Sequence, residues 1–180
     1  MPATIANFVD QLATATEIDA GDYLIVHDTS AGVPKKVLSG VASTPVAIGD
    51  VTSYAVLPAN SGRVHIIGAL TADCTITLPT SVVGLSYEFW FCSTAAEAQN
   101  AKIVTDSATN CFNGGVVHLD VDSGTGADEV VAVYSNGSSN DTLNLITPAA
   151  GTRVMVVSSG SKWYLVGTVV SATAPTIADT

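Results

Sequence analysis

The sequence predicts an all-β protein: an antiparallel β-sandwich, jelly-roll-like in arrangement, preceded by an N-terminal arm and hairpin. Three observations favour this class. Short apolar segments recur along the chain, turn-forming residues separate them, and no segment has a convincing helical periodicity. Segments of this kind at a spacing of about ten residues are typical of two packed sheets rather than of a parallel α/β sheet. The order of the strands does not follow from the sequence.

Residues 1–50 are predicted to form the arm with its short hairpin. Residues 21–40 read GDYLIVHDTSAGVPKKVLSG, two apolar segments on either side of a turn rich in Asp, Ser, Gly and Pro. Residues 39–53 are rich in Gly, Ser, Thr and Pro, which is typical of a linker or an extended crossing segment. Because an isolated hairpin is only marginally stable, we expect the arm to pack on its own domain, a second copy or another protein.

Residues 51–172 are predicted to form the sandwich, because they alternate apolar and polar residues. In TADCTITLP, Cys74, Ile76 and Leu78 share one strand face, so Cys74 is predicted to be a small core residue. Residues 173–180 show no pattern and are predicted to form a C-terminal tail. The strands are expected, in order, in SYAVLP, VHIIGAL, TADCTITLP, LSYEFWFCS, KIVTD, VVHLDVD, EVVAVYS, DTLNLITP, RVMVVSS and WYLVGTVVS.

The composition restricts the partners. Only 12% of the residues are charged, 47% are hydrophobic, and the formal net charge is −10. Phosphate binding needs clustered Lys and Arg, so we expect no nucleic-acid partner and no anionic membrane surface. We expect neither a secretory signal nor a transmembrane helix. A surface so poor in charge favours burial against neighbouring proteins in an assembly.

No residue pattern indicates catalysis. The nucleophile motif GxSxG and the phosphate-binding motif GxxxxGK[ST] are absent. The three histidines, His27, His65 and His118, fall in three separate segments and are expected to be ordinary strand residues. The sequence therefore predicts that the protein is not an enzyme and holds no cofactor.

The cysteines and acidic residues do not form a recognisable metal site. An odd number of cysteines without a CxxC pair, at positions 74, 92 and 111, predicts reduced thiols and no metal site. The acidic segment Asp120–Glu129 matches only the first two ligands of an EF-hand loop. A solvated hairpin is the simpler interpretation, and whether this loop binds a metal is left open.

Trp163 and Tyr164 leave a second alternative open. They begin an expected strand directly after a turn, where Trp often packs at the end of a sheet. The alternative is a carbohydrate contact, which would make the domain a carbohydrate-binding module.

Two parts of the sequence resemble structural proteins of tailed-bacteriophage virions. The stretch EIDAGDYLIVHDTSAGVPKKVLSG is similar to a small module near the N termini of tail fibres and other virion proteins. The body resembles structural proteins of tailed phages in the stretches SGRVHIIGALTADCTITLPT, GGVVHLDVDSGTGADEVV and GTRVMVVSSGSKWYLVGTVVSATAPTIAD. Thr-hydrophobic-Leu-Pro followed later by Gly-Ser-x-Trp-Tyr is a frequent signature of phage β-domains. The residues that carry the first likeness are Asp22, Tyr23, Asp28, Lys35, Lys36 and Val37.

The resemblance implies a virion component made in the host cytoplasm, for which two roles compete. Capsid decoration (cement) proteins are small, all-β and often trimeric, and they use an arm to grip the major capsid protein. The alternative is a tail-fibre, tail adaptor or receptor-binding subunit, but fibres usually need extended repeats or a coiled coil. We therefore expect a homotrimeric decoration protein on the outer capsid surface, where its acidic balance fits, binding the major capsid protein and stabilising the shell.

The arm is predicted to supply the partner-binding residues. Lys35 and Lys36 are two of only six cations in the chain. They indicate either an edge strand whose charge discourages aggregation or an electrostatic contact with an acidic partner. The predicted partner-binding residues are Tyr23, Ile25, His27, Lys35, Lys36 and Val37.

Overall fold

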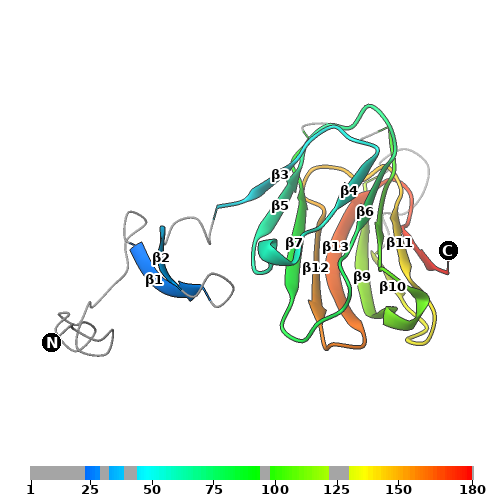
Figure 1. Cartoon of the computed structure of the whole chain (residues 1–180). Coiled ribbons are helices and arrows are strands. Elements are labelled where there is room, and N and C mark those ends of the chain that lie inside the picture. Colours follow the sequence, from blue (N-terminus) through cyan, green and yellow to red (C-terminus); the bar gives the residue numbers. More distant parts are fainter. Residues whose placement is uncertain (1–22, 29–32, 39–43, 94–97, 122–129, 180) are drawn as a thin grey trace, which may run out of the picture. The chain divides into compact units, whose positions relative to one another are not determined.

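The computed structural model describes residues 23–28, 33–38, 44–93, 98–121 and 130–179, and divides the chain into two units, Met1–Ser43 and Thr44–Thr180. In the first unit, β1 (Tyr23–Asp28) pairs antiparallel with β2 (Val33–Leu38) in a two-stranded sheet (Figure 1). The hairpin predicted from the sequence is therefore confirmed.

The second unit is a sandwich of a seven-stranded and a five-stranded sheet, so the predicted all-β sandwich is also confirmed (Figure 1). The strand orders are β10-β9-β13-β12-β7-β5-β3 and β14-β11-β8-β6-β4. The larger sheet consists of β3 (Val46–Ile48), β5 (Val64–Ile67), β7 (Ser86–Phe91), β9 (Phe112–Asp120), β10 (Val130–Tyr134), β12 (Arg153–Ser158) and β13 (Trp163–Ser171). The smaller sheet consists of β4 (Ser53–Ala55), β6 (Cys74–Thr77), β8 (Ala101–Val104), β11 (Thr142–Leu145) and β14 (Thr176–Ala178). The short 3-10 helices Pro58–Asn60 and Ala108–Asn110 lie in connections.

The core of the sandwich is formed by alternate residues of its strands. In β7, Tyr87, Phe89 and Phe91 are buried, whereas the residues between them are not. Trp163, at the start of β13, packs beside Tyr87 with their ring centroids 5.8 Å apart. The prediction for Cys74 is confirmed, because this side chain is buried in the core and its thiol is free.

The strand pairing is mixed, which corrects the prediction of a purely antiparallel sandwich. From β3 to β8, successive strands alternate between the two sheets, so β3-β5-β7 and β4-β6-β8 are parallel sets. This part of the chain winds as a coil in which each strand crosses to the opposite sheet. β13 also pairs parallel with β9, whereas the other pairs of this unit are antiparallel. Period-two alternation is the same for either direction of pairing, so the sequence did not reveal the coil.

Both ends of the sandwich extend beyond the limits predicted from the sequence. Residues 46–48, predicted to belong to the arm, form β3 and pair with β5. Residues 176–178, predicted to lie in a tail, form β14 and pair with β11, and Ile177 packs against the core. Each strand has only three residues, which is too short to show an alternation in the sequence. The boundary between the units falls after Ser43 rather than near residue 50.

Candidate interaction surface

The outer face of the seven-stranded sheet carries large apolar side chains on several neighbouring strands. The register brings them together: Val166 of β13 lies opposite Met155 of β12 and Gly115 of β9, and Gly115 lies opposite Tyr134 of β10. Val130, Tyr134 and Val166 are 73%, 75% and 60% exposed. We define the outer apolar face as the exposed residues Trp90, Val117, Leu119, Val130, Tyr134, Met155, Tyr164 and Val166.

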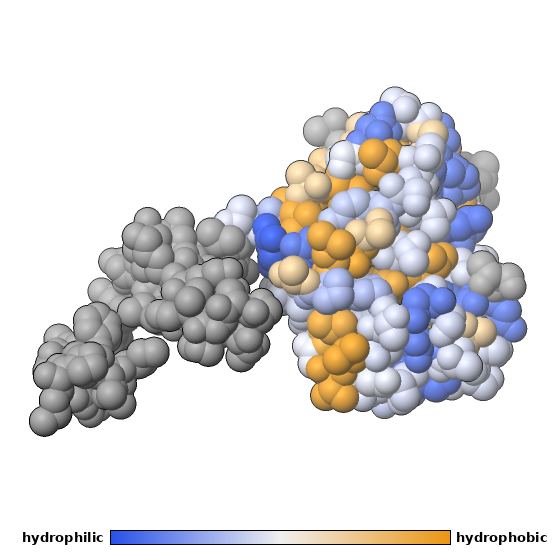
Figure 2. Space-filling model, in the orientation of Figure 1, coloured by the Kyte–Doolittle hydropathy of each residue, from blue (hydrophilic) through white to orange (hydrophobic). Residues whose placement is uncertain are grey.

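The space-filling view agrees that apolar residues reach the surface of the sandwich. Figure 2 shows several separate hydrophobic areas on the side turned to the viewer, among pale and hydrophilic residues. A sheet face that meets water usually carries polar residues. Exposed apolar residues that the register places on neighbouring strands therefore mark an interaction surface.

The outer face of the five-stranded sheet is different. None of the exposed large apolar side chains in the described part of the chain lies on β4, β6, β8, β11 or β14. The register aligns one residue from each strand in a row across this sheet, and every member of the row is polar: Ser53, Thr75, Lys102, Asn144 and Thr176.

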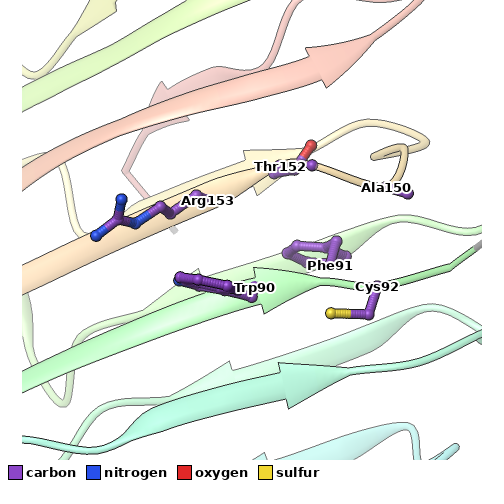
Figure 3. Close-up of a pocket in the computed structure, with 7 residues that line it drawn as sticks. Trp90, Phe91, Cys92, Ala150, Thr152 and Arg153 are labelled. Atoms are coloured by element: carbon purple, nitrogen blue, oxygen red, sulfur yellow. The ribbon is translucent and has the colours of Figure 1, made fainter.

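The outer apolar face includes one ion pair. Arg153 of β12 donates its Nε–H to Oε1 of Glu88 on β7. The guanidinium carbon of Arg153 lies 5.4 Å from the centroid of the Trp90 ring, within range of a cation–π interaction. Figure 3 shows Trp90 and Arg153 beside each other on neighbouring strands. The two charges cancel, so this part of an acidic protein has no net charge.

Two open hollows adjoin Arg153. One, of about 400 Å³, lies where β7 ends and β12 begins, between Trp90, Cys92, Gly151 and Arg153 (Figure 3). The other, of about 360 Å³, lies on the outer apolar face itself, and Met155 and Val166 contribute to its lining. Hollows of this kind beside exposed aromatic side chains accept projecting groups of a binding partner.

His65 belongs to the core rather than to a site. Its side chain is fully buried, and its ring lies 6.2, 5.8 and 5.2 Å from the ring centroids of Tyr54, Tyr87 and Phe89. Burial lowers the pKa of His65 below its usual value of 6.5, and the backbone of its neighbours opposes this only in part. His65 is therefore held neutral among aromatic rings.

His118, like His65, is a buried strand residue. His118 is buried on β9, and its Nε2 lies 2.9 Å from the backbone carbonyl oxygen of Ser171 on β13. The side chain of His27 lies outside the described residues. Within the described part of the sandwich, His65 and His118 therefore have separate surroundings.

The described residues contain no group of three or more His, Cys, Asp or Glu side chains placed to hold a metal ion. Residues 122–129, most of the acidic segment Asp120–Glu129, lie outside them. Cys74, Cys92 and Cys111 are free thiols, and Lys162 Nζ donates to Cys111 Sγ at 2.8 Å. No helix in the described ranges is long and apolar enough to cross a membrane.

The predicted partner-binding residues all lie on the two strands of the hairpin. The register places Ile25 opposite Lys36, and His27 opposite Pro34. The structure describes the backbone of these strands and not their side chains. The residues concerned are Tyr23, Ile25 and His27 on β1, and Lys35, Lys36 and Val37 on β2.

The carbohydrate contact considered for Trp163 is wrong. Its side chain is 0% exposed and packs in the core, whereas the adjacent Tyr164 lies on the outer apolar face. Sequence reasoning missed this face because its residues come from strands far apart along the chain. One signal was present: VVAVY of β10 and WYLV of β13 are apolar at both alternate positions, which predicts contact on both sides.

The sequence matches no model of a known protein family, and no curated protein is significantly similar to it. The resemblance to virion proteins therefore stays a prediction. The function has to be argued from the hairpin and from the surface of the sandwich.

Proposed function

We propose that this chain is a virion structural protein, most simply a capsid decoration protein that binds the major capsid protein and stabilises the shell. One observation carries the proposal. The hairpin of β1 and β2 forms a two-stranded sheet of its own, whereas the sandwich has a complete core. A two-stranded hairpin is marginally stable alone, so an external surface would supply the free energy that orders it.

The hairpin suits docking by strand addition. Among the described strands, β1 and β2 pair only with each other, so each has one edge whose N–H and C=O groups remain available to a partner strand. Lys35 and Lys36 on β2 place two positive charges in an acidic chain, which favours an acidic site on the partner. The resemblance to phage proteins supplies the identity of that partner, the major capsid protein.

The role is structural rather than enzymatic. In the described part of the sandwich, the most conspicuous surface is apolar with a single ion pair, an arrangement that binds protein rather than activating a nucleophile. Capsid decoration proteins are often trimeric, so a homotrimer is part of the proposal.

Removal of residues 1–43 tests the docking role. The boundary after Ser43 keeps β3 and the whole sandwich, so the shortened protein should fold with unchanged β-sheet circular dichroism and lose binding to isolated capsids. Normal decoration of capsids by the shortened protein would contradict the proposal.

A charge-reversal variant tests the same role in the full chain. Lys35→Glu with Lys36→Glu should weaken capsid binding and make the remaining binding less dependent on salt. Lys102→Glu, on the outer face of the five-stranded sheet, is the control for a single charge reversal away from the hairpin and should bind as the unmodified chain does.

The hairpin's likeness to modules of tail fibres favours a second candidate, a tail-fibre or tail adaptor subunit. Electron microscopy of particles labelled with an antibody to this chain separates the two roles. Label over the shell supports decoration, and label confined to the tail supports the second candidate.

A further inference from the structure

We propose that the outer apolar face is covered by a second copy of this chain. The proposed function already includes a homotrimer, and this inference rests on that part of it. It names the surface of the sandwich through which copies meet, a surface other than the hairpin that binds the capsid. Three properties of the face carry it: its extent, its lack of net charge, and the presence of hollows beside projecting aromatic side chains.

The extent of the face is near what a specific interface needs. It spans β10, β9, β13, β12 and β7, which are adjacent in the sheet. Five strands at about 4.8 Å spacing, over about six residues at 3.3 Å each, cover about 480 Å². Two such faces in contact bury about 1,000 Å² before side-chain relief is counted, which is the lower bound for a specific association.

The charge of the face favours a copy over a foreign partner. Each chain carries a net charge of −10, so two copies repel wherever acidic surface meets acidic surface. At the outward positions of the seven strands, the charged side chains are Arg153 and Glu88, which pair with each other. A basic partner would be matched by an acidic face, and an acidic partner by a basic one. A neutral apolar face is matched by itself.

The relief of the face is also self-complementary. Tyr134 projects from β10 and Tyr164 from β13. The hollow lined by Met155 and Val166 lies over β12 and β13. Gly115 lies between Tyr134 and Val166 in the sheet, and Tyr134 occupies the space that a side chain at Gly115 would need. In an interface between copies, a projecting aromatic ring of one chain enters the hollow of the other. Aromatic residues are enriched in the cores of such interfaces.

The mass of the full chain in solution, measured by sedimentation velocity over a range of concentrations, tests the proposal. The unmodified chain should show a mass at least twice the 18.3 kDa of one chain, and three times that mass if the copies form the homotrimer of the proposed function. Val166→Glu places an unpaired charge at the centre of the face and should weaken self-association at least about tenfold, or 1.4 kcal/mol. An unmodified chain that is monomeric at its highest soluble concentration overturns the proposal.

A matched pair of edge-strand variants controls for folding and for charge. Val130→Glu on β10 and Thr176→Glu on β14 both add one negative charge at an exposed position of an edge strand. Val130→Glu should weaken self-association as Val166→Glu does, and Thr176→Glu should leave it unchanged. If Val166→Glu does not fold, Val130→Glu decides. Equal weakening by both edge variants, or by neither, contradicts the proposal.

The capsid-binding variant separates this inference from the proposed function. The full chain with Lys35→Glu and Lys36→Glu should keep its self-association, because these residues lie on the hairpin. Loss of capsid binding with self-association retained supports both proposals. Loss of self-association in this variant shows that the hairpin holds the copies together and overturns the role of the outer apolar face.

Discussion

The two sheets of the sandwich have similar inner faces and opposite outer faces. Inside, both contribute fully buried side chains such as Phe89 of the larger sheet and Leu143 of the smaller one. Outside, the smaller sheet presents a row of polar residues, whereas the larger presents Val130, Tyr134 and Val166. The inner faces explain why the unit folds. The difference between the outer faces indicates which side meets a partner.

The largest expected effect tests the similarity of the inner faces. Phe89→Ala should lower the free energy of unfolding by about 3–5 kcal/mol and Leu143→Ala by about 2–5 kcal/mol, because both leave cavities in one core. Urea denaturation followed by circular dichroism measures both. If either variant lowers the free energy of unfolding by less than about 1 kcal/mol, its sheet does not share the core.

The next effect concerns the ion pair on the outer apolar face. Arg153→Met removes the positive charge over the Trp90 ring and leaves Glu88, whose side chain is only 19% exposed, without its partner. We expect a loss of about 1 kcal/mol of stability, the upper end for an ion pair with one exposed partner.

The double variant separates the charge from the packing. Arg153→Met combined with Glu88→Gln removes both charges and should recover most of the lost stability. If the double variant is no more stable than Arg153→Met alone, the loss comes from packing on Trp90 rather than from the unpaired carboxylate.

The burial of His65 makes the stability of the folded chain depend on pH. Because the pKa of His65 is lowered in the folded state, the unfolded chain binds the proton more readily, and acid favours unfolding. The contribution of His65 to the free energy of unfolding is present in full above pH 6.5. It is lost as the pH falls from 6.5 toward the lowered pKa, by at most about 1.4 kcal/mol per pH unit. Urea denaturation at several pH values measures this slope.

His65→Phe is the control for the pH dependence. It keeps an aromatic ring among Tyr54, Tyr87 and Phe89 but cannot bind a proton. The stability of this variant should depend less on pH between 6.5 and 5 than that of the unmodified chain. The same slope in both proteins would assign the effect to other groups.

The sequence predicts the inner faces well because burial on one side of a strand is a local pattern. The alternation in TADCTITLP identifies Cys74 and Ile76 as core residues, and the structure buries both. The turn residues of the hairpin are local in the same way. The parallel coil of β3 to β8 is not local, because it depends on which sheet each strand enters after a turn.

Trp163 and Tyr164 show why the outer apolar face is harder to predict. Both are large and adjacent, and the strand they begin is apolar at both alternate positions, so the sequence does not say which of the two faces the core. The structure buries Trp163 against Tyr87 and leaves Tyr164 exposed. Only the position of β13 between β9 and β12 determines this choice, and that position is set by pairing with distant residues.

The smallest expected effect on stability gives the sharpest comparison of the outer faces. Val166→Thr and Thr75→Val exchange nearly equal volumes at outward positions of central strands, so each should change the stability of one chain by no more than about 0.5 kcal/mol. Their effects on association should differ, because only Val166 lies on the outer apolar face. Val166→Thr should shift sedimenting material toward the single chain, and Thr75→Val should leave the distribution unchanged. A shift in mass with Thr75→Val and none with Val166→Thr would reverse the assignment, making the polar sheet the one that meets other copies.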